Sequence, residues 1–484
     1  MKQRRFITGS FAAAAAFLFF FQAGLRLAQA AEPAAARVVI VGGGLAGLVA
    51  DYELQERGIT AHLLEAADRF GGRVATVDYG QGIKAEYGLH EIWKKNPLLD
   101  YVKKFNLPLA EPGEPYSSVY IDGKLYPYVQ DTAAEYFATL FTPAEQAEYD
   151  RWMKACEPLY DTAESKGLTP ELSALQESSF ADWVGTFKLS SKVAEFIRLT
   201  IECEVARDWA DISAVYGIQQ YGIFLHGTEP CFHVKGGNTR IIDAFVAAIK
   251  GPKTLGAQVT RIVHSLKPDG KTEVVVYYKK DNIMSSVTAE KVIVTAPYHQ
   301  LNNIQLEPGL TEQQSQAVET IVQGRYTVVH FLLDTGVNRI LLVDGQNPFP
   351  VLTRGPLGVI YGFSELPAAG QKEMNFGLLV HGDYTRTYLE PQDKVRARLL
   401  AEMDKIWPGF SKYVHATYFY GYHPAAVPGW APGRSPLDAL SASLTQENEG
   451  LFLAGDYVYT SHSEGAVISG RNTAKKAADG LKAD

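Results

Sequence analysis

The sequence predicts an α/β protein, α+β overall, in which a domain built on a parallel sheet is interleaved with a second domain of mixed sheet and helices. Three observations predict this fold class. A glycine-rich turn joins a buried strand to a helix near the start of the chain, and a strand followed by a helix rich in small residues closes it. The 484 residues also exceed what one hydrophobic core usually supports. The first domain is therefore expected to be discontinuous.

The composition excludes several classes of protein. Hydrophobic residues make up 46% of the chain and charged residues 21%, which is typical of a globular protein rather than a disordered one. The three cysteines, Cys156, Cys203 and Cys231, cannot form a disulfide framework and lack the close spacing of metal ligands. A net charge of −8 argues against a nucleic-acid partner, which needs a basic surface.

The first thirty residues are typical of an export signal. Arg4-Arg5-Phe6 precedes an apolar run at 11–21 and an Ala-x-Ala site at 28–30, as in a twin-arginine signal peptide. An uncleaved membrane anchor is the alternative, but the run is shorter than the ~20 residues of a spanning helix. We therefore expect a bacterial periplasmic or secreted protein with no stable membrane span after cleavage. Removing 1–30 takes away four basic and no acidic residues, so 454 residues with a charge of −12 would remain.

The first element after this segment is a buried strand at 37–41, which leads into Gly42-Gly-Gly44-Leu-Ala-Gly47 and then a helix. Gly42 permits the tight turn, Gly44 lets the backbone approach a pyrophosphate, and Gly47 lets the helix pack against the strand. A second strand follows and ends at Glu65, whose carboxylate can accept hydrogen bonds from an adenosine ribose. The unit predicts a Rossmann-like dinucleotide-binding domain, and the acid disfavours NADP.

The continuation Glu65-Ala-Ala-Asp-Arg69-Phe-Gly-Gly72-Arg73 resembles the FAD-dependent amine oxidase superfamily. That group includes monoamine and polyamine oxidases, L-amino-acid oxidases, protoporphyrinogen oxidase and phytoene desaturases. The resemblance implies that Arg69, Gly72 and Arg73 lie along the pyrophosphate and flavin of FAD.

The C-terminal segment carries a second part of the same resemblance. An apolar strand stops at Gly455-Asp456, and a helix with small residues in its first turns starts near Glu464. The small residues would let the positive helix end approach a flavin edge that becomes anionic on reduction. The resemblance implies that Asp456 binds the ribityl or pyrophosphate portion and that Ala466 and Val467 lie under the pyrimidine ring.

A third patch, Lys235-Gly-Gly-Asn-Thr-Arg240, precedes a helix and then Val259, whose backbone would meet the adenine by the same resemblance. The expected FAD-binding domain therefore comprises 37–90, 232–300 and 445–484, and the substrate-binding domain 91–231 and 301–444. The residues expected to bind FAD are Gly42, Gly44, Leu45, Ala46, Gly47, Glu65, Ala66, Arg69, Gly72, Arg73, Val259, Gly455, Asp456, Glu464, Ala466 and Val467.

The resemblance also implies a dry, aromatic slot in which an amine is oriented toward the flavin. Trp430 and His462 are the two side chains expected to flank the amine, and Asn303 stands where the family has a lysine that holds a water. Because Asn303 replaces that lysine, the acceptor of the electrons is left open between oxygen and a periplasmic redox carrier. No cysteine stands near Trp430, so the FAD is expected to be noncovalent.

The expected function is oxidation of a small-molecule primary or secondary amine by hydride transfer to FAD, followed by hydrolysis of the imine. Two alternatives remain open from the sequence. One is FAD-dependent C–C oxidation of a porphyrinogen or isoprenoid-like substrate, because the segment 422–430 and Gly455-Asp456-Tyr457 also resemble relatives with that chemistry. The other is a non-enzymatic binding protein with this fold. The oligomeric state is not predicted.

Overall fold

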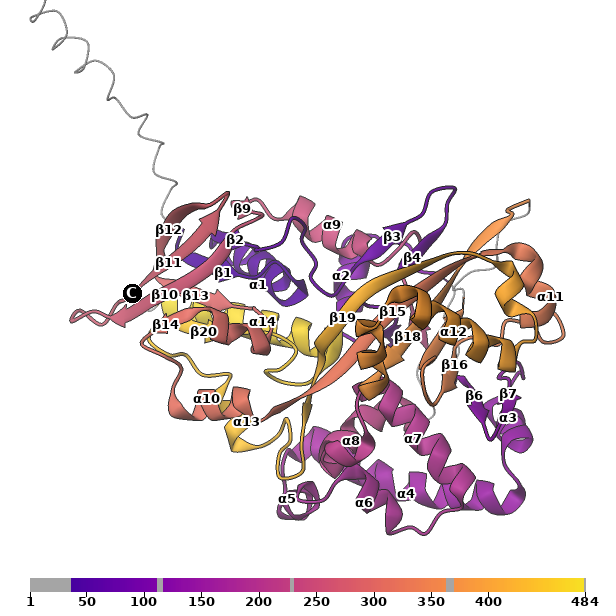
Figure 1. The fold of residues 1–484 in the computed structure, drawn as a ribbon. Coiled ribbons are helices and arrows are strands. Elements are labelled where there is room, and N and C mark those ends of the chain that lie inside the picture. The colour runs from indigo at the N-terminus through magenta and orange to yellow at the C-terminus, as the bar shows by residue number, and fades with distance from the viewer. Residues whose placement is uncertain (1–35, 111–115, 227–229, 363–369, 483–484) are drawn as a thin grey trace, which may run out of the picture.

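The computed structural model describes residues 36–110, 116–226, 230–362 and 370–482, so the expected signal at 1–30 lies outside the described residues. The predicted first strand is the central strand of a five-stranded parallel sheet, and the glycine turn follows it (Figure 1). In spatial order its strands are β20 (Leu451–Leu453), β13 (Lys291–Val294), β1 (Val38–Val41), β2 (Ala61–Leu64) and β9 (Lys253–Thr254). All four residues of β1 are buried, as expected for a strand with parallel neighbours on both sides.

Helices cover this sheet, and two of them, from opposite ends of the chain, pack against each other. α1 (Leu45–Glu56) packs against α14 (His462–Lys482), and a Cβ on Gly470 would lie 2.6 Å from the Ala46 carbonyl oxygen. This close approach explains the small residues of the C-terminal helix. Two further helices, α2 (Leu98–Lys104) and α9 (Thr239–Ala248), contribute to the same buried core.

A second, four-stranded sheet lies beside the parallel sheet. Its order is β12 (Ile283–Ala289), β11 (Thr272–Lys280), β10 (Gln258–Leu266) and β14 (Gln305–Glu307). Two small antiparallel pairs complete the sheets described so far: β3 (Thr76–Asp78) with β4 (Lys84–Glu86), and β5 (Ile92–Trp93) with β8 (Cys231–Phe232).

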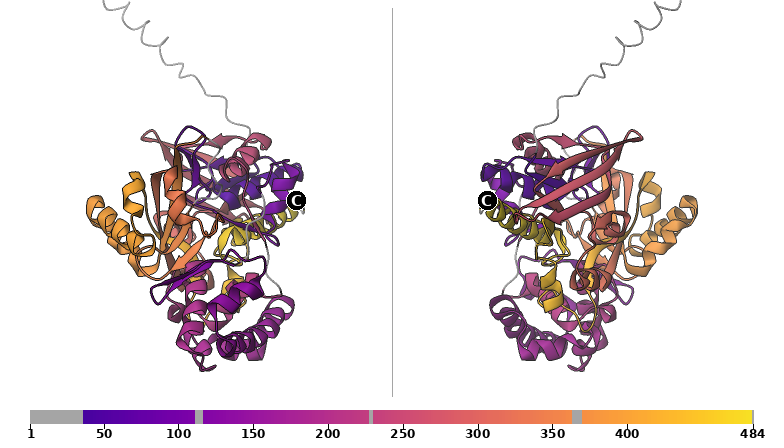
Figure 2. Two further views of the ribbon diagram at one scale, coloured as in Figure 1. Left: turned by 90° about the vertical axis from the view of Figure 1, so that its right-hand side faces the viewer. Right: turned by 90° about the vertical axis from the view of Figure 1, so that its left-hand side faces the viewer.

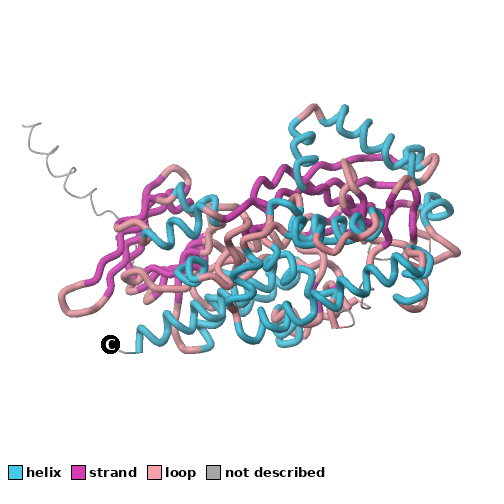
Figure 3. Tube along the Cα trace, turned by 90° about the horizontal axis from the view of Figure 1, so that it is seen from below, coloured by secondary structure: helices cyan, strands magenta, loops and turns pink. Residues whose placement is uncertain are grey.

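The remaining large sheet has seven strands and belongs to the other half of the molecule (Figure 3). Its order is β19 (Val414–Trp430), β15 (Ile321–Asp334), β18 (Glu373–His381), β17 (Val359–Gly362), β16 (Val351–Thr353), β6 (Ser118–Ile121) and β7 (Lys124–Tyr126). The helices α11 (Asn338–Leu341) and α12 (Gln392–Ile406) pack against this sheet and share a hydrophobic core with its strands.

A group of helices lies together below the sheets in both side views (Figure 2). It consists of α3 (Ala133–Leu140), α4 (Pro143–Lys166), α5 (Pro170–Gln176), α6 (Phe180–Gly185), α7 (Ser191–Val205) and α8 (Ala214–Gln220). α4 starts at a capping box, in which Thr142 and Glu145 satisfy each other's backbone N–H groups. Two short helices, α10 (Glu312–Glu319) and α13 (Ala439–Ser443), lie against each other.

The predicted fold class, α/β and α+β overall, is confirmed. All five strands of the parallel sheet come from the segments expected to form the FAD domain. β14 and α2, however, come from segments expected in the substrate domain and pack with the parallel-sheet half. Among the described residues, no helix is both long enough and apolar enough to cross a bilayer.

Candidate active site

A cavity of about 970 Å³ opens where strands of the parallel sheet end. Its walls include the residues that follow four strands: Gly42 after β1, Glu65 after β2, Thr295 after β13 and Gly455 beyond β20. Ligands of open parallel sheets bind at this edge, because the loops there diverge and the helices that follow point their N-termini inward. The volume lies near the top of the range of ~300–1,000 Å³ for ligand pockets.

The glycine turn shapes one wall of the cavity. Gly42 has φ of +111°, and a Cβ there would lie 2.6 Å from Thr295 Oγ1. A Cβ on Gly47 would lie 2.0 Å from the Gly42 carbonyl oxygen, whereas one on Gly44 would meet no atom within 4 Å. Gly47 is therefore needed for packing, and Gly44 leaves open space in the cavity for a ligand to approach the backbone.

The N-terminus of α1 faces the same space. Its N-cap, Gly44, has no side chain to accept from the first N–H groups, so they are available to an anion such as a pyrophosphate. Glu65 lies beside the turn, where Oε2 accepts from the Gly43 N–H at 2.6 Å and Oε1 from the Ala67 N–H at 2.7 Å. Each carboxylate oxygen can accept a second hydrogen bond, so the Glu65 side chain can also bind a ribose.

Arg73 and Asp456 join the two motifs from the ends of the chain. The two terminal nitrogens of the guanidinium donate to the two carboxylate oxygens at 2.6 and 2.7 Å, and Nη1 also donates to the Ala426 carbonyl at 2.5 Å. The Asp456 side chain is only 3% exposed, whereas that of Arg73 is 44% exposed toward the cavity. Asp456 therefore fixes the arginine, which presents its remaining N–H groups and positive charge to a ligand.

Two of the lining residues carry a buried polar atom that has no hydrogen-bond partner among the described residues. These atoms are Nε2 of His462 and the hydroxyl of Tyr457. His462 has a left-handed φ of +68°, which is uncommon outside glycine, and it begins α14. Burial, opposed by the charge of Asp456 and assisted by that of Arg73, lowers the pKa of His462 to about 4, so the ring is neutral at physiological pH.

The far wall of the cavity comes from the seven-stranded sheet. Tyr326 and Val328 of β15 and Leu379 of β18 face the cavity, and Val328 pairs with Leu379 across the two strands. Opposite them, Tyr87 lines the cavity and its ring stacks on Tyr420 at 4.8 Å. This end of the cavity is therefore apolar and aromatic, as the resemblance implies for the substrate slot.

Most of the residues expected to bind FAD lie in this one cavity, although they come from three distant segments. The lining residues among them are Gly42, Gly44, Leu45, Ala46, Glu65, Ala66, Arg69, Gly72, Arg73, Val259, Gly455, Asp456 and Ala466. Gly47, Glu464 and Val467 do not line it. Gly47 and Val467 are buried in the packing of α1 and α14, and the Glu464 side chain is exposed.

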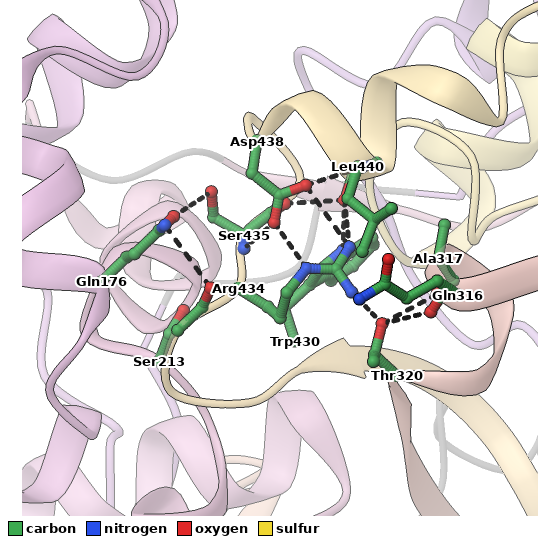
Figure 4. Close-up of polar contacts among 12 residues, drawn as sticks. Gln176, Ser213, Gln316, Ala317, Thr320, Trp430, Arg434, Ser435, Asp438 and Leu440 are labelled. Atoms are coloured by element: carbon green, nitrogen blue, oxygen red, sulfur yellow. Dashed lines mark hydrogen bonds and ion pairs between the residues drawn. The ribbon is translucent and has the colours of Figure 1, made fainter. Parts of the chain in front are cut away.

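The structure corrects the expectation for Trp430. Its side chain is 1% exposed, does not line the cavity, and lies 5.1 Å from the ring of Tyr216 between centroids. The indole N–H donates to Ser441 Oγ at 2.9 Å, within a polar cluster around Arg434 and Asp438 (Figure 4). The cavity wall on β19 is instead formed by His423, Ala426 and Val427.

The other two residues expected to act in catalysis, His462 and Asn303, do line the cavity. Asn303 Nδ2 donates to Gln300 Oε1 at 2.6 Å, and Gln300 also lines the wall. Sequence reasoning missed Thr295, Tyr326, Leu379 and His423. Thr295 could have been found, because it ends a recognisable strand, but the others follow only from the pairing of distant strands.

Comparisons with known proteins agree with this site. The family model described as flavin containing amine oxidoreductase matches residues 45–478. The L-amino-acid oxidase BmooLAAO-I of Bothrops moojeni is 24% identical over 475 residues, covering 91% of this chain and 88% of that protein. The flavin-dependent L-tryptophan oxidase RebO of Lentzea aerocolonigenes is 24% identical over 318 residues, so the match covers 61% of this chain and 65% of that relative's length.

Among solved structures, cyclohexylamine oxidase from Brevibacterium oxydans IH-35A has the same fold. Its TM-score is 0.77 at 18% sequence identity, with 93% of this chain and 100% of the other covered.

The cofactor is FAD, and the residues present fit it. The open space at Gly44, the free N–H groups of α1 and the Arg73 guanidinium suit a pyrophosphate, and Glu65 suits the adenosine ribose.

Proposed function

The chain belongs to the family of flavin-containing amine oxidoreductases, and from this premise we propose that it oxidises a small primary or secondary amine. It is an FAD-dependent oxidoreductase, which replaces the alternative of a non-enzymatic binding protein. When FAD is bound, its flavin ring can accept a hydride from the α-carbon of the amine. The resulting imine takes up water and gives a carbonyl product and ammonia or a smaller amine.

The observation that carries this proposal is the placement of positive charge in the cavity. Among the described lining residues, the only arginine or lysine side chains are Arg69 and Arg73. Arg73 is held by Asp456, and Arg69 Nη2 donates to the Gly72 carbonyl at 2.7 Å. Arg73 lies at the glycine-turn end, whereas Arg69 also lies over the Tyr87 ring, 5.7 Å from its centroid. Among the described lining residues, no lysine or arginine comes from the strands that carry Tyr326 and Leu379. The carboxylate of an amino acid would therefore have no counterion on that wall, whereas an amine needs none.

We infer a role for His462 in orienting this amine. His462 lines the cavity, and its buried Nε2 has no partner among the described residues, so a turn of the ring toward the cavity would let Nε2 accept a hydrogen bond from an amine N–H. Because burial lowers the pKa of His462 to about 4, the ring stays neutral and adds no positive charge that would repel a protonated substrate. The apolar wall formed by Tyr326, Val328 and Leu379 excludes water around the reacting carbon.

Anaerobic bleaching of the purified yellow holoenzyme tests the proposed reaction. A panel would contain linear primary and secondary amines, L-amino acids, a porphyrinogen and a polyene. Rapid loss of the flavin absorbance with amines alone supports amine oxidation. Bleaching by amino acids only would assign the activity to amino-acid oxidation, and bleaching by the porphyrinogen or polyene only would assign it to C–C oxidation.

We also propose that the reduced enzyme passes electrons to a periplasmic redox carrier rather than rapidly to oxygen. Asn303 supports this proposal, because it stands where the family has a lysine that holds a water. Its side chain lines the cavity and donates a hydrogen bond to Gln300. Reoxidation of the reduced flavin would be followed with air and with a cytochrome. Slow reaction with air and fast reaction with the cytochrome is the expected result, and fast reaction with air would overturn the proposal.

Export is proposed on the sequence alone, from Arg4-Arg5-Phe6 and the apolar run that follows. The double substitution Arg4→Lys with Arg5→Lys should retain the folded flavoprotein in the cytoplasm of a bacterial host. Periplasmic and cytoplasmic fractions would be compared by immunoblot, with Lys2→Arg as the matched control. Equal export of the double variant would contradict twin-arginine targeting.

The FAD is proposed to be noncovalent, because none of the three cysteines lines the cavity. Acid precipitation of the holoenzyme should release the flavin into the supernatant. Flavin that stays with the denatured protein would refute this proposal.

A further inference from the structure

Four tyrosine side chains form a continuous path from the cavity wall to the surface. The first, Tyr87, lines the cavity, and its ring stacks on that of Tyr420 with 4.8 Å between centroids. The hydroxyl oxygens of Tyr420 and Tyr79 lie 2.5 Å apart, and the rings of Tyr79 and Tyr418 lie 4.9 Å apart between centroids. Tyr418 is 39% exposed. The path therefore connects the cavity to solvent through aromatic rings in contact.

Two elements from distant parts of the chain supply these rings. Tyr79 directly follows β3 and Tyr87 directly follows β4, so the small antiparallel pair carries two of them. Tyr418 and Tyr420 are two positions apart on β19, so their side chains lie on the same face of that strand. His330 of β15 pairs with Tyr418, and its ring lies 4.9 Å from that of Tyr420 between centroids. The path thus exists only where these elements meet.

The buried His330 gives the hydrogen bonds of this path a direction. Its Nε2 lies 2.9 Å from the Glu86 carbonyl, which can only accept, so Nε2 carries the hydrogen. Burial lowers the pKa of His330 to about 3, so the ring is neutral and its Nδ1 is an acceptor. Tyr79 therefore donates to Nδ1 at 2.7 Å, and the Tyr79 oxygen accepts from the hydroxyl of Tyr420.

This arrangement suits Tyr79 to one-electron oxidation. A phenol that loses an electron becomes a far stronger acid than an imidazolium ion and must give up its proton. The lone pair of His330 Nδ1 already accepts a hydrogen bond from that proton, so the proton needs to move only along this bond. Because the ring of Tyr79 also contacts that of Tyr418, an electron from the surface needs to cross only a short distance to reach it.

We propose that this path is a redox relay, in which Tyr79 and His330 pass oxidising equivalents from the cavity to Tyr418 and so protect the cavity lining from oxygen-centred radicals. In the first step, an alkoxyl or peroxyl radical in the cavity takes one electron from the relay and becomes an alkoxide or hydroperoxide anion. Tyr79 loses that electron, and the proton of its hydroxyl moves to His330 Nδ1, which leaves a neutral phenoxyl radical beside an imidazolium ion.

The second step restores the relay. A reductant of the thiol or ascorbate class in solution gives one electron to Tyr79 through Tyr418, and the proton returns from His330 to the Tyr79 oxygen. The sum of the two steps is transfer of one electron from the external reductant to the radical. The relay is independent of the substrate that the enzyme oxidises, so its test does not rest on the proposed function.

Oxidation of the holoenzyme from the surface tests the outer part of the relay. The protein would be mixed in the dark with hexachloroiridate(IV), a one-electron oxidant, frozen rapidly and examined by electron paramagnetic resonance. We expect a tyrosyl radical whose yield falls at least fivefold in Tyr79→Phe and is unchanged in Tyr384→Phe, which removes a tyrosine that is 43% exposed. Tyr418→Phe should slow radical formation at least threefold and leave the spectrum unchanged. Wild-type yield in Tyr79→Phe, or the wild-type rate in Tyr418→Phe, would overturn the relay.

A variant of His330 separates proton transfer from structure. His330→Asn keeps an oxygen that can accept the hydrogen bond of Tyr79 but cannot take its proton. At the FAD content and unfolding midpoint of wild type, it should lower the radical yield as much as Tyr79→Phe does. A wild-type yield in His330→Asn would overturn the assignment of His330 as the proton acceptor.

Oxidative damage to the lining tests the inner part of the relay. Holoenzyme would be incubated with ascorbate and a water-soluble azo initiator, which releases peroxyl and alkoxyl radicals, and its peptides analysed by mass spectrometry. The oxidised fractions of His423 and Tyr457, which line the cavity, should rise at least threefold in Tyr79→Phe and stay at the wild-type level in Tyr384→Phe. Equal damage in wild type and Tyr79→Phe would overturn the protective role.

Discussion

The two ends of the cavity differ in the charged groups that line them. At the cofactor end, Arg73 is held by both oxygens of Asp456, and both oxygens of Glu65 accept backbone N–H groups. At the substrate end, the wall is formed by Tyr326, Val328 and Leu379, and the described lining includes no lysine or arginine from their strands. A cofactor that stays bound is best served by polar groups fixed in advance, whereas an apolar wall orients a small substrate and excludes water around the reacting carbon. The following substitutions test this difference, beginning with the largest expected effect.

Gly47→Ala should have the largest effect, because its Cβ would lie 2.0 Å from the Gly42 carbonyl oxygen. We expect α1 to move, the FAD content to fall more than tenfold, and the protein without FAD to lose about 1–3 kcal/mol of stability. The matched control is Gly44→Ala, where no atom lies within 4 Å. It should weaken FAD binding and leave the stability without FAD unchanged. Equal unfolding curves for the two variants without FAD would contradict this separation of packing from binding.

Asp456→Asn should come next, because it removes the buried partner of Arg73. Loss of one member of such a pair costs about 3 kcal/mol, which corresponds to a roughly 100-fold weaker binding of FAD. Fluorescence titration of the protein with FAD would measure this change. Asp100→Asn breaks an exposed pair with Arg471 and should alter FAD affinity by less than about 0.5 kcal/mol. Unchanged affinity in Asp456→Asn would show that Arg73 needs no fixed partner.

Glu91→Gln should stabilise the protein in a pH-dependent way. Burial raises the pKa of Glu91 from its ordinary 4.5 to about 7, so the folded state binds this proton more tightly than the unfolded state does. The acid therefore lowers stability progressively as pH rises from about 4.5 to 7, and the loss is complete above 7. Urea unfolding of holoenzyme at pH 5 and pH 8 should show a gain of about 1–2 kcal/mol that is larger at pH 8. A gain that is the same at both pH values would exclude ionisation of Glu91 as its cause.

Substitution of His462 should have the smallest effect among these variants. His462→Leu removes the acceptor and should lower kcat/KM for an amine about tenfold, or ~1.4 kcal/mol. His462→Gln keeps an acceptor of similar reach and should retain activity within about threefold. Rates of anaerobic flavin bleaching would be compared at equal FAD content. A larger loss in the Gln variant than in the Leu variant would contradict a hydrogen bond to the amine.

The cofactor end of the cavity could be predicted from the sequence because its parts are local. The glycine turn, Glu65 and Arg73 follow one another along a short stretch, and each has a task that its own residue type reveals. The substrate end could not be predicted in this way. Tyr326 and Leu379 lie 53 positions apart and face one cavity only because β15 and β18 pair with Val328 opposite Leu379.

Trp430 shows how one such prediction failed. Side chains alternate between the two faces of a strand, so the face that a residue takes depends on the register of the strand with its neighbours. β19 pairs with β15 so that Trp430 lies opposite Ile321, and the indole enters the core beside Tyr216. The bend and bulges of β19 then leave Ala426 and Val427 at the cavity. No pattern in the segment itself distinguishes these two outcomes.

The sequence by itself determined that this protein folds around a parallel sheet and binds FAD, since short contiguous motifs carry both the turn geometry and the chemistry. The tertiary structure alone decided what faces the substrate. It brought Tyr326 and Leu379 together on one wall, and among the described lining residues it placed no lysine or arginine from their strands there. The reason is physical: a local motif fixes its own backbone, whereas the charge of a cavity is the sum over segments that meet only when the chain is folded.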